Sequence, residues 1–219
     1  MNRQSRILFL VPHADDEVLG FGGTICKMVQ QGHHVSVVIA QAPNHQRAQK
    51  QLQDALKAKD ILGYNDLEFL SISHQDLCND LFQLIGKVEE CIDQYKPDIL
   101  YTTHLSDNHQ DHKNLYRAVS IATRPNTCSY AKQIITGEVL SSCDQSFSIE
   151  RNQFAPNIYE VLTETLVNKK IEALQCYSTE CMAPPHSRSP EAVLVKVASR
   201  GQECKSFYAE AFMLLRDIR

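Results

Sequence analysis

The residues whose types and spacing could do chemistry begin with the stretch HADDE at residues 13–17, which directly follows a short apolar run. His13 and Asp16 are three residues apart, so in a tight turn or the first turn of a helix their side chains face the same side. Asp15 is rotated away from both. One face could therefore hold a metal ion while Asp15 reaches a group beside it. Acidic residues at a helix start are also typical of capping, which is the structural alternative for this stretch.

A second stretch, HLSDNHQDH at residues 104–112, has the same pattern. His109 and His112 are three residues apart, with Asp107 and Asp111 beside and between them. If the two stretches meet, they offer two imidazoles and one carboxylate, a ligand set that leaves the open fourth position of a catalytic zinc site. Water bound there would be acidified to near neutrality and ready to attack a carbonyl group. Capping alone does not explain two such clusters in a chain with 9 histidines, so the pattern favours a metal site.

Alternating strands and helices are expected to position these two stretches. The predicted elements are strands at residues 6–11, 34–40, 67–70, 98–102, 133–136 and 158–162, and helices at residues 18–29, 46–62, 80–95, 164–176 and near 208–215. This alternation is typical of right-handed βαβ units and predicts an α/β fold, a Rossmann-like three-layer sandwich with a mainly parallel sheet between helices. Ligands bind at the carboxyl ends of such strands, so the metal site is expected there, where both stretches fall.

Composition limits the class of protein and its partners. A length of 219 residues suits one domain that spans residues 1–219. A net charge of -4 without a basic block argues against nucleic acid as a partner, and no apolar stretch approaches the roughly 20 residues of a transmembrane helix. The 8 cysteines include no C-x-x-C pair and are typical of free thiols in the cytoplasm. The sequence leaves the oligomeric state open and is compatible with a homo-oligomer.

Several stretches of the chain resemble one known family. VPHADDEVLGFGGTI resembles the (A/P)-H-P-D-D-E motif of the PIG-L/LmbE family of zinc-dependent N-acetyl-sugar deacetylases, and SDNHQDH resembles its H-x-D-H motif. ALKAKDILGY, PHSRSPEAVLVKVASRG and FYAEAF are similar to further sections of the family, so the resemblance covers most of the chain. Ala14 stands where the family usually has proline, which frees φ at that turn without removing a functional group.

The resemblance implies a role for each residue of the two motifs. The implied ligands of Zn²⁺, or of another divalent transition metal such as Fe²⁺, are His13, Asp16 and His112. Asp15 would be the general base that deprotonates the metal-bound water. His109 would stabilise the oxyanion or protonate the leaving amine. Asp111 would hydrogen-bond the other ring nitrogen of His109 and keep it charged, with a role as a loop cap as an equal alternative.

Four further residues are candidates for contact with the substrate. Arg47 and Arg188 could clamp a phosphate group or sugar hydroxyls, since arginine binds such groups through two parallel hydrogen bonds. Asp76 matches an aspartate with which the family often contacts the sugar, and it suits a turn equally well. His186 lies in a proline-bounded loop that could approach the site. Solvated surface positions are the alternative for both arginines and for His186. The loops expected to set specificity are residues 43–47, 71–78 and 181–190.

The resemblance and the two motifs together predict a metal-dependent hydrolase. The expected reaction removes acetyl from an N-acetylglucosamine-type sugar or sugar conjugate, a small-molecule amino-sugar substrate. One alternative is a hydrolase of another amide or of a phosphoester that uses the same metal. A phosphoesterase with two metals would need more carboxylates, bridging ions about 3.5 to 4 Å apart. The other alternative is a non-catalytic sugar-binding relative, against which the intact Asp15 argues.

Overall fold

The seven strands of the described residues belong to one mixed sheet. The structure is a computed structural model, and it describes residues 4–42, 48–147, 149 and 153–219. The strands lie in the spatial order β3-β2-β1-β4-β5-β7-β6. They are β1 (Arg6–Val11), β2 (His34–Gln41), β3 (Asp66–Ile72), β4 (Ile99–Thr103), β5 (Gln133–Gly137), β6 (Ile158–Leu162) and β7 (Tyr208–Asp217). The first five strands are mutually parallel, and β7 runs antiparallel to both of its neighbours.

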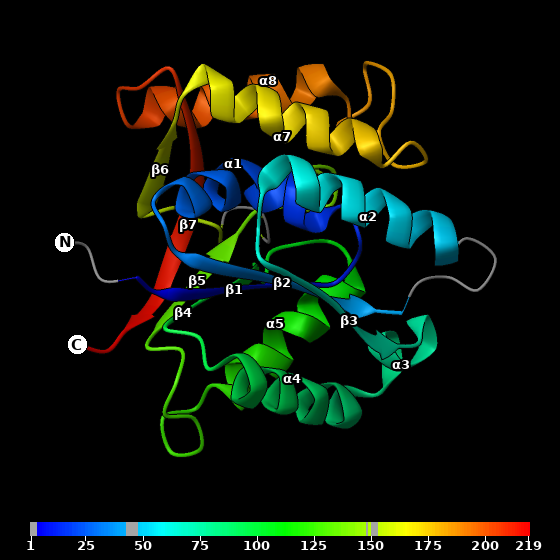
Figure 1. The fold of residues 1–219 in the computed structure, drawn as a ribbon, viewed down its shortest axis with the longest axis vertical. Coiled ribbons are helices and arrows are strands. Elements are labelled where there is room, and N and C mark those ends of the chain that lie inside the picture. The colour runs from blue at the N-terminus through cyan, green and yellow to red at the C-terminus, as the bar shows by residue number, and fades with distance from the viewer. Residues whose placement is uncertain (1–3, 43–47, 148, 150–152) are drawn as a thin grey trace.

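Helices cover both faces of the sheet, which gives three layers (Figure 1). In the view of Figure 1, α1, α2, α7 and α8 lie above the sheet, and α3, α4 and α5 lie below it. The helices are α1 (Asp16–Gln30), α2 (Ala48–Leu62), α3 (His74–Asn79), α4 (Leu81–Tyr95), α5 (Gln110–Ala122), α7 (Glu164–Cys176) and α8 (Pro190–Glu203). The mainly parallel α/β architecture expected from the sequence is confirmed.

Side chains of β1 alternate between two buried cores. Ile7 and Phe9 pack into the core under α1, whereas Leu8 and Leu10 pack into the core on the side of α4 and α5. Both faces of β1 are buried from Ile7 to Val11, as expected for a central parallel strand whose sequence is a continuous apolar run. The strand that leads into the first motif is therefore fixed on both sides.

The order of the strands reverses between β1 and β4. The chain moves outward from β1 to β2 and β3, then returns to pair β4 with the other edge of β1 and continues outward to β5. The loops that follow β1 and β4 therefore diverge at this point, which in open α/β sheets is where ligands bind. Residues 13–17 follow β1, and residues 104–112 follow β4.

One predicted element is wrong. The segment near residues 208–215 was expected to be a helix, and it is the strand β7, which lies between β5 and β6. Alanine, glutamate, methionine and leucine favour helices by intrinsic propensity. Pairing with a neighbour on each side overrides that preference, because a strand at this position satisfies both rows of its backbone hydrogen bonds.

Three helices, α3, α5 and α8, are additional to those expected from the sequence. α5 begins inside the second motif, at Gln110. The region 183–190 was interpreted as a loop, and α8 begins within it at Pro190, with Ser189 as an N-cap that accepts a hydrogen bond from the backbone of Ala192. Proline in the first turn after a serine cap is a typical start signal. The expected loop 71–78 likewise contains the short helix α3, capped by Ser73. The expected helix 46–62 is described from Ala48 onward. No helix within the described ranges is long and apolar enough to cross a membrane.

Candidate metal centre

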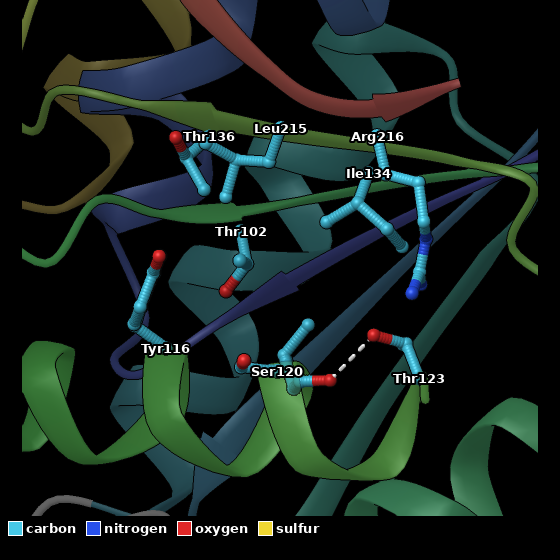
Figure 2. A pocket seen from close by; sticks show the side chains of 9 residues that line it. Thr102, Tyr116, Ser120, Thr123, Ile134, Thr136, Leu215 and Arg216 are labelled. Carbon is cyan, nitrogen blue, oxygen red and sulfur yellow. Dashed lines mark hydrogen bonds between the residues drawn. The ribbon is translucent and has the colours of Figure 1, made fainter. Parts of the chain in front are cut away.

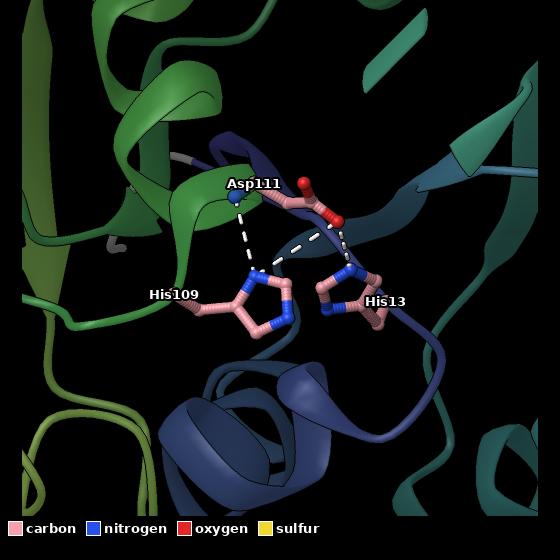
Figure 3. Close-up of side chains that lie close together, drawn as sticks. All are labelled: His13, His109 and Asp111. Atoms are coloured by element: carbon pink, nitrogen blue, oxygen red, sulfur yellow. Dashed lines mark hydrogen bonds and ion pairs between the residues drawn. The ribbon is translucent and has the colours of Figure 1, made fainter. Parts of the chain in front are cut away.

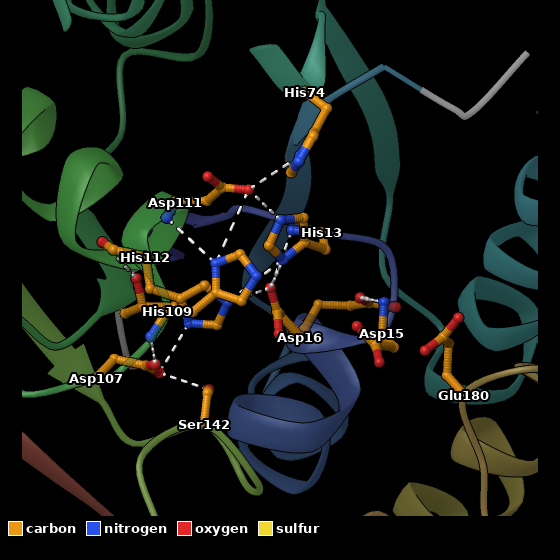
Figure 4. A network of polar contacts seen from close by, with 12 residues as sticks. His13, Asp15, Asp16, His74, Asp107, His109, Asp111, His112, Ser142 and Glu180 are labelled. Carbon is orange, nitrogen blue, oxygen red and sulfur yellow. Dashed lines mark hydrogen bonds and ion pairs between the residues drawn. The ribbon is translucent and has the colours of Figure 1, made fainter. Parts of the chain in front are cut away.

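Three ligand atoms from the two motifs form a nearly equilateral triangle. His13 Nδ1 lies 3.3 Å from Asp16 Oδ2, and His112 Nε2 lies 3.2 Å from the same oxygen. The two ring nitrogens are 3.3 Å apart. These residues come from the start of α1 and the first turn of α5, almost a hundred positions apart in the chain. The sheet therefore brings together the three side chains that the sequence grouped (Figure 4).

This triangle fits one face of a zinc tetrahedron. Ligands at about 2.0 to 2.1 Å from a tetrahedral zinc ion lie roughly 3.3 Å from one another. The donor set of two imidazoles and one carboxylate is also one that zinc binds in catalytic sites, with a fourth position left for water or substrate. His13, Asp16 and His112 could therefore hold a metal ion in nearly the arrangement they have here.

The turn after β1 holds Asp16 by local hydrogen bonds. The backbone N–H of His13 donates to Asp16 Oδ2 at 2.9 Å, which directs that oxygen toward the histidines. Asp15 is the N-cap residue of α1, but its side chain makes no capping hydrogen bond. The capping explanation of the acidic stretch therefore fails for Asp15, whose carboxylate remains available for another role.

Each of the two candidate ligand histidines is hydrogen-bonded to a second carboxylate. Asp111 Oδ2 lies 2.8 Å from His13 Nε2, and Asp107 Oδ2 lies 2.8 Å from His112 Nδ1. Such partners fix the ring orientation and the tautomer of a metal-binding histidine and make it a stronger ligand. Asp107 is itself fixed, because it accepts hydrogen bonds from Ser142 Oγ and from the backbone N–H of His109.

Replacing Asp107 by asparagine is expected to weaken zinc binding about 10- to 100-fold, because His112 loses its anionic partner. Competition with a chromophoric chelator measures this change. The matched control is Ser142→Ala, which removes a neighbour of Asp107 but leaves the carboxylate on His112. An Asp107→Asn protein that binds zinc as tightly as the wild type would show that this pair does not support a metal ligand.

The carboxylates around His13 and His112 favour positive charge on or between the two rings. Burial lowers the pKa of His13, but hydrogen bonds with Asp111 and Asp16 outweigh it and raise the pKa to about 9. Burial also opposes the charged form of His112, yet Asp16 and Asp107 raise its pKa to about 10. The surrounding carboxylates therefore stabilise positive charge between the two rings. A metal ion bound there would supply that charge in place of protons.

Asp15 has an environment suited to accepting a proton. Its side chain is buried, and burial together with the adjacent Asp16 raises its pKa well above the usual range, while Arg188 acts against this rise. Arg188 Nη1 lies 3.3 Å from Asp15 Oδ2 and 2.6 Å from Glu180 Oε2. Figure 4 shows Asp15 between Asp16 and Glu180, on the side of the cluster away from His109.

Glu17 holds the backbone of Asp15 in an unusual conformation. Asp15 has a φ of 125°, which residues other than glycine rarely adopt and which costs of order 1 to 3 kcal/mol. Its N–H donates to Glu17 Oε2 at 3.0 Å, and the hydroxyl of Tyr177 donates to Glu17 Oε1 at 2.5 Å. The buried Glu17 therefore ties the motif to the end of α7 and fixes where the Asp15 side chain lies.

His109 lies at the mouth of the cluster, with its side chain 42% exposed. Its Nδ1 accepts a hydrogen bond from the backbone N–H of Asp111 at 3.2 Å, so the proton of the neutral ring is on Nε2. The expected hydrogen bond from His109 to the Asp111 carboxylate is not formed. Asp111 Oδ2 lies 3.9 Å from His109 Nδ1, a long ion-pair contact, and makes its hydrogen bond with His13 (Figure 3). Burial and then the neighbouring His13 and His112 lower the pKa of His109, which favours the neutral ring over the charged one expected from the sequence.

A family match covers both motifs. The PIG-L family, described as GlcNAc-PI de-N-acetylase, matches residues 8–123, which include every residue of the cluster. The chain belongs to the PIG-L family. Its members are hydrolases of the deacetylase class, and a small-molecule acetylated substrate is what the family implies.

Relatives of known sequence or structure agree with this assignment. The uncharacterized deacetylase YaiS of Escherichia coli (strain K12) is 27% identical over 184 residues, which make up 80% of this chain and 91% of YaiS. The N,N'-diacetylchitobiose deacetylase of Pyrococcus horikoshii, solved with an inhibitor, has a TM-score of 0.78 at 17% identity, covering 97% of this chain and 84% of the other. The zinc-inhibited form of the teicoplanin deacetylase Orf2 has a TM-score of 0.78 at 15% identity, covering 97% and 99%. At such identities the two structures show a common fold.

The four residues of this PIG-L chain that were expected to contact the substrate have different surroundings. Asp76 accepts a hydrogen bond from Ser73 Oγ in the cap of α3, which is the turn role considered for it. His186 is exposed, and its Nδ1 accepts the backbone N–H of Arg188. Arg188 contacts Asp15 and Glu180 as described above. Arg47 lies outside the described residues.

Sequence reasoning missed several residues that the structure places at this PIG-L site. The second motif places Asp107 beside the histidines but does not indicate its partner. Glu17 was assigned only to the helix start. His74 and Cys78, both on α3, lie next to Asp111 and had no motif to mark them. The four-residue spacing of His74 and Cys78 was the one available signal, because it places both on one helix face.

A separate cavity of about 400 Å³ lies between α5 and strands β4, β5 and β7 (Figure 2). Its lining includes Thr102, Thr136 and Arg216, and none of the described residues of the metal cluster lines it. The chemistry of this chain is therefore expected at the cluster of His13, Asp16 and His112 and not in this cavity.

Proposed function

We propose that this chain is a zinc-dependent deacetylase that hydrolyses the acetamide of an N-acetylglucosamine-type sugar or sugar conjugate. The observation that carries the proposal is the triangle of His13 Nδ1, Asp16 Oδ2 and His112 Nε2 with the uncapped Asp15 beside it. Family membership supports the deacetylation. The name of the Pyrococcus horikoshii relative, a diacetylchitobiose deacetylase, supports a sugar substrate.

The three atoms of the triangle are proposed to hold the metal. When bound, zinc would supply a Lewis acid that polarises the acetyl carbonyl and makes water acidic enough to attack it near neutral pH. Asp111 and Asp107 would orient the two histidine ligands through the ring nitrogens that do not face the ion. This second role for Asp111 replaces the one expected from the sequence, in which it served His109.

Asp15 is proposed to be the general base. A base works best when its pKa lies near the working pH, and burial beside Asp16 moves the pKa of this carboxyl in that direction. Arg188 opposes full protonation by its contact with Asp15 Oδ2. Glu17 keeps the Asp15 backbone in position. The proton that Asp15 accepts can later be delivered to the leaving amine.

His109 is proposed to donate a hydrogen bond from Nε2 to the substrate. Its Nδ1 is already taken by the backbone N–H of Asp111, which leaves the Nε2–H directed away from that turn. Its half-exposed position at the mouth suits contact with the carbonyl oxygen as negative charge develops there, or with the amine as it leaves. Arg188 and His186 remain proposed contacts for the sugar, on the loop that borders Asp15.

The thiol chemistry of the chain supports the expected cytoplasmic setting. All 8 cysteines lie in the described part of the chain, and all are free. Free thiols at half-buried positions such as Cys78 and Cys181 persist in a reducing compartment.

The test of the proposed function is an assay of amine release across a panel of N-acetylated sugars, which includes free, phosphorylated and lipid-linked N-acetylglucosamine. We expect turnover of at least one of them, loss of turnover after chelation, and recovery when zinc is added back. Phosphoesters and simple acetanilides in the same panel test the alternative hydrolase activities. A zinc-loaded protein that releases no amine from any acetylated sugar would contradict the proposal.

A further inference from the structure

A second group of ligand atoms lies directly behind the candidate metal centre. His74, Cys78 and Asp111 place one nitrogen, one sulfur and one carboxylate oxygen within 4.8 Å of one another. Cys78 Sγ lies 2.8 Å from Asp111 Oδ1, and His74 Nδ1 lies 3.6 Å from Asp111 Oδ2. Figure 4 shows His74 above Asp111, on the side away from Asp107.

The fold holds these three residues in place. His74 and Cys78 are four residues apart on α3, so both face the same side of that helix. The side chain of Asn114 on α5 donates to the carbonyl oxygens of Leu77 and Cys78 at 3.0 and 2.8 Å. This contact clamps α3 against the helix that carries Asp111. The distance between the two ligands on α3 and the carboxylate is therefore set by helix packing.

We propose that His74, Cys78 and Asp111 form a second binding site for a divalent transition metal, and that an ion there inhibits the enzyme. Thiolate, imidazole and carboxylate together favour Zn²⁺ or Co²⁺ over the hard ions Mg²⁺ and Ca²⁺. The thiol proton that now lies between Cys78 Sγ and Asp111 Oδ1 would leave to solvent, and the ion would take its place. The exposed His74, with 68% of its side chain accessible, can turn onto the ion without moving the backbone.

The inhibition follows from what the two sites share. Asp111 Oδ2 bonds His13, while Asp111 Oδ1 faces Cys78, so an ion on the second oxygen pulls on the partner of a proposed zinc ligand. The inhibitory part of this inference rests on the proposed function. The binding part does not.

Cobalt absorption tests the binding independently of turnover. The protein is first loaded with one equivalent of zinc, and Co²⁺ is then added. We expect wild-type protein to take up a second equivalent with a sulfur-to-cobalt charge-transfer band, because the first cluster consists of His13, Asp16 and His112 and offers no sulfur ligand. Cys78→Ser and His74→Ala are expected to lose the second equivalent and, with it, the band. The matched control Cys128→Ser changes a half-buried thiol elsewhere and keeps both.

The same proteins are then assayed at increasing zinc. We expect excess zinc to inhibit wild type and Cys128→Ser. Cys78→Ser and His74→Ala, each compared with its own activity at one equivalent of zinc, are expected to escape the inhibition. Absence of the charge-transfer band in wild type, or its survival in Cys78→Ser, would overturn the second site. Loss of the band with unchanged zinc inhibition would overturn its inhibitory role. A chain that deacetylates nothing in the panel but still shows the band would refute only the proposed function.

Discussion

Replacing Asp15 by asparagine is expected to lower kcat by about 10²- to 10⁴-fold, the usual contribution of a positioned general base. Asparagine has nearly the same shape but cannot accept the proton of the attacking water. The proposed ligands of the metal are untouched, and the Asp15 side chain caps no helix, so zinc content and folding should be retained. Steady-state kinetics on the best substrate of the panel, together with metal analysis of the same sample, measure both effects.

The control for this prediction is Asp98→Asn. Asp98 lies at the opposite edge of the sheet, where its carboxylate accepts a hydrogen bond from the backbone of Arg6 at 2.8 Å. The Asp98→Asn substitution removes one negative charge, as Asp15→Asn does, but at a position away from the metal cluster. The kcat of this variant should therefore stay near the wild-type value. An Asp15→Asn enzyme with full zinc and wild-type turnover would remove Asp15 from the mechanism and leave another group as the base.

The metal cluster could be predicted because each half of it is a local pattern. The spacing of His13 and Asp16 and the position of His112 after a strand are visible in the sequence, and the parallel sheet needs only to align two strand ends. The pairing between the carboxylates and the histidine rings could not be predicted in the same way. Asp111 is two residues from His109 and yet its carboxylate bonds His13 on another element, because side-chain direction depends on how α5 packs against the first loop. Proximity in sequence pointed to His109, which lies 3.9 Å from Asp111 Oδ2, whereas the hydrogen bond of that oxygen is with His13.

The C-terminal part of the fold shows a similar limit. Residues near 208–215 have strong intrinsic helix formers, so local propensity predicts a helix. The strand forms because its position between β5 and β6 is available only once the rest of the chain has folded. By contrast, the start of α8 was marked in the sequence by Ser189 and Pro190, and it was missed because the preceding prolines suggested a loop. The pairing of β7 depends on distant strands and cannot be seen in its local sequence, whereas the cap of α8 can.

The strand β7 also carries a buried charge that reaches into α1. Glu210 is almost fully buried, and its carboxylate accepts hydrogen bonds from the backbone N–H groups of Gly23 and Thr24 at 3.0 and 2.7 Å. Lys170 on α7 completes the group, with its ammonium 2.5 Å from Glu210 and 2.9 Å from the carbonyl oxygen of Leu19. The network joins α1, α7 and β7 behind the first motif. An added Cβ at Gly23 would lie 3.2 Å from Glu210 Oε1 and 2.4 Å from Leu162 Cδ1, which explains why glycine stands there.

Replacing Lys170 by methionine is expected to lower the free energy of unfolding by about 3 to 5 kcal/mol, because it leaves the buried Glu210 carboxylate without its cation. Urea unfolding followed by circular dichroism measures the change. The double variant Lys170→Met with Glu210→Gln should recover much of the loss, since no unpaired charge then remains inside. The control Lys87→Met breaks an exposed pair with Glu90 and should cost no more than about 1 kcal/mol. If Lys170→Met were as mild as Lys87→Met, the charge of Glu210 would have to be balanced by the backbone of α1 alone.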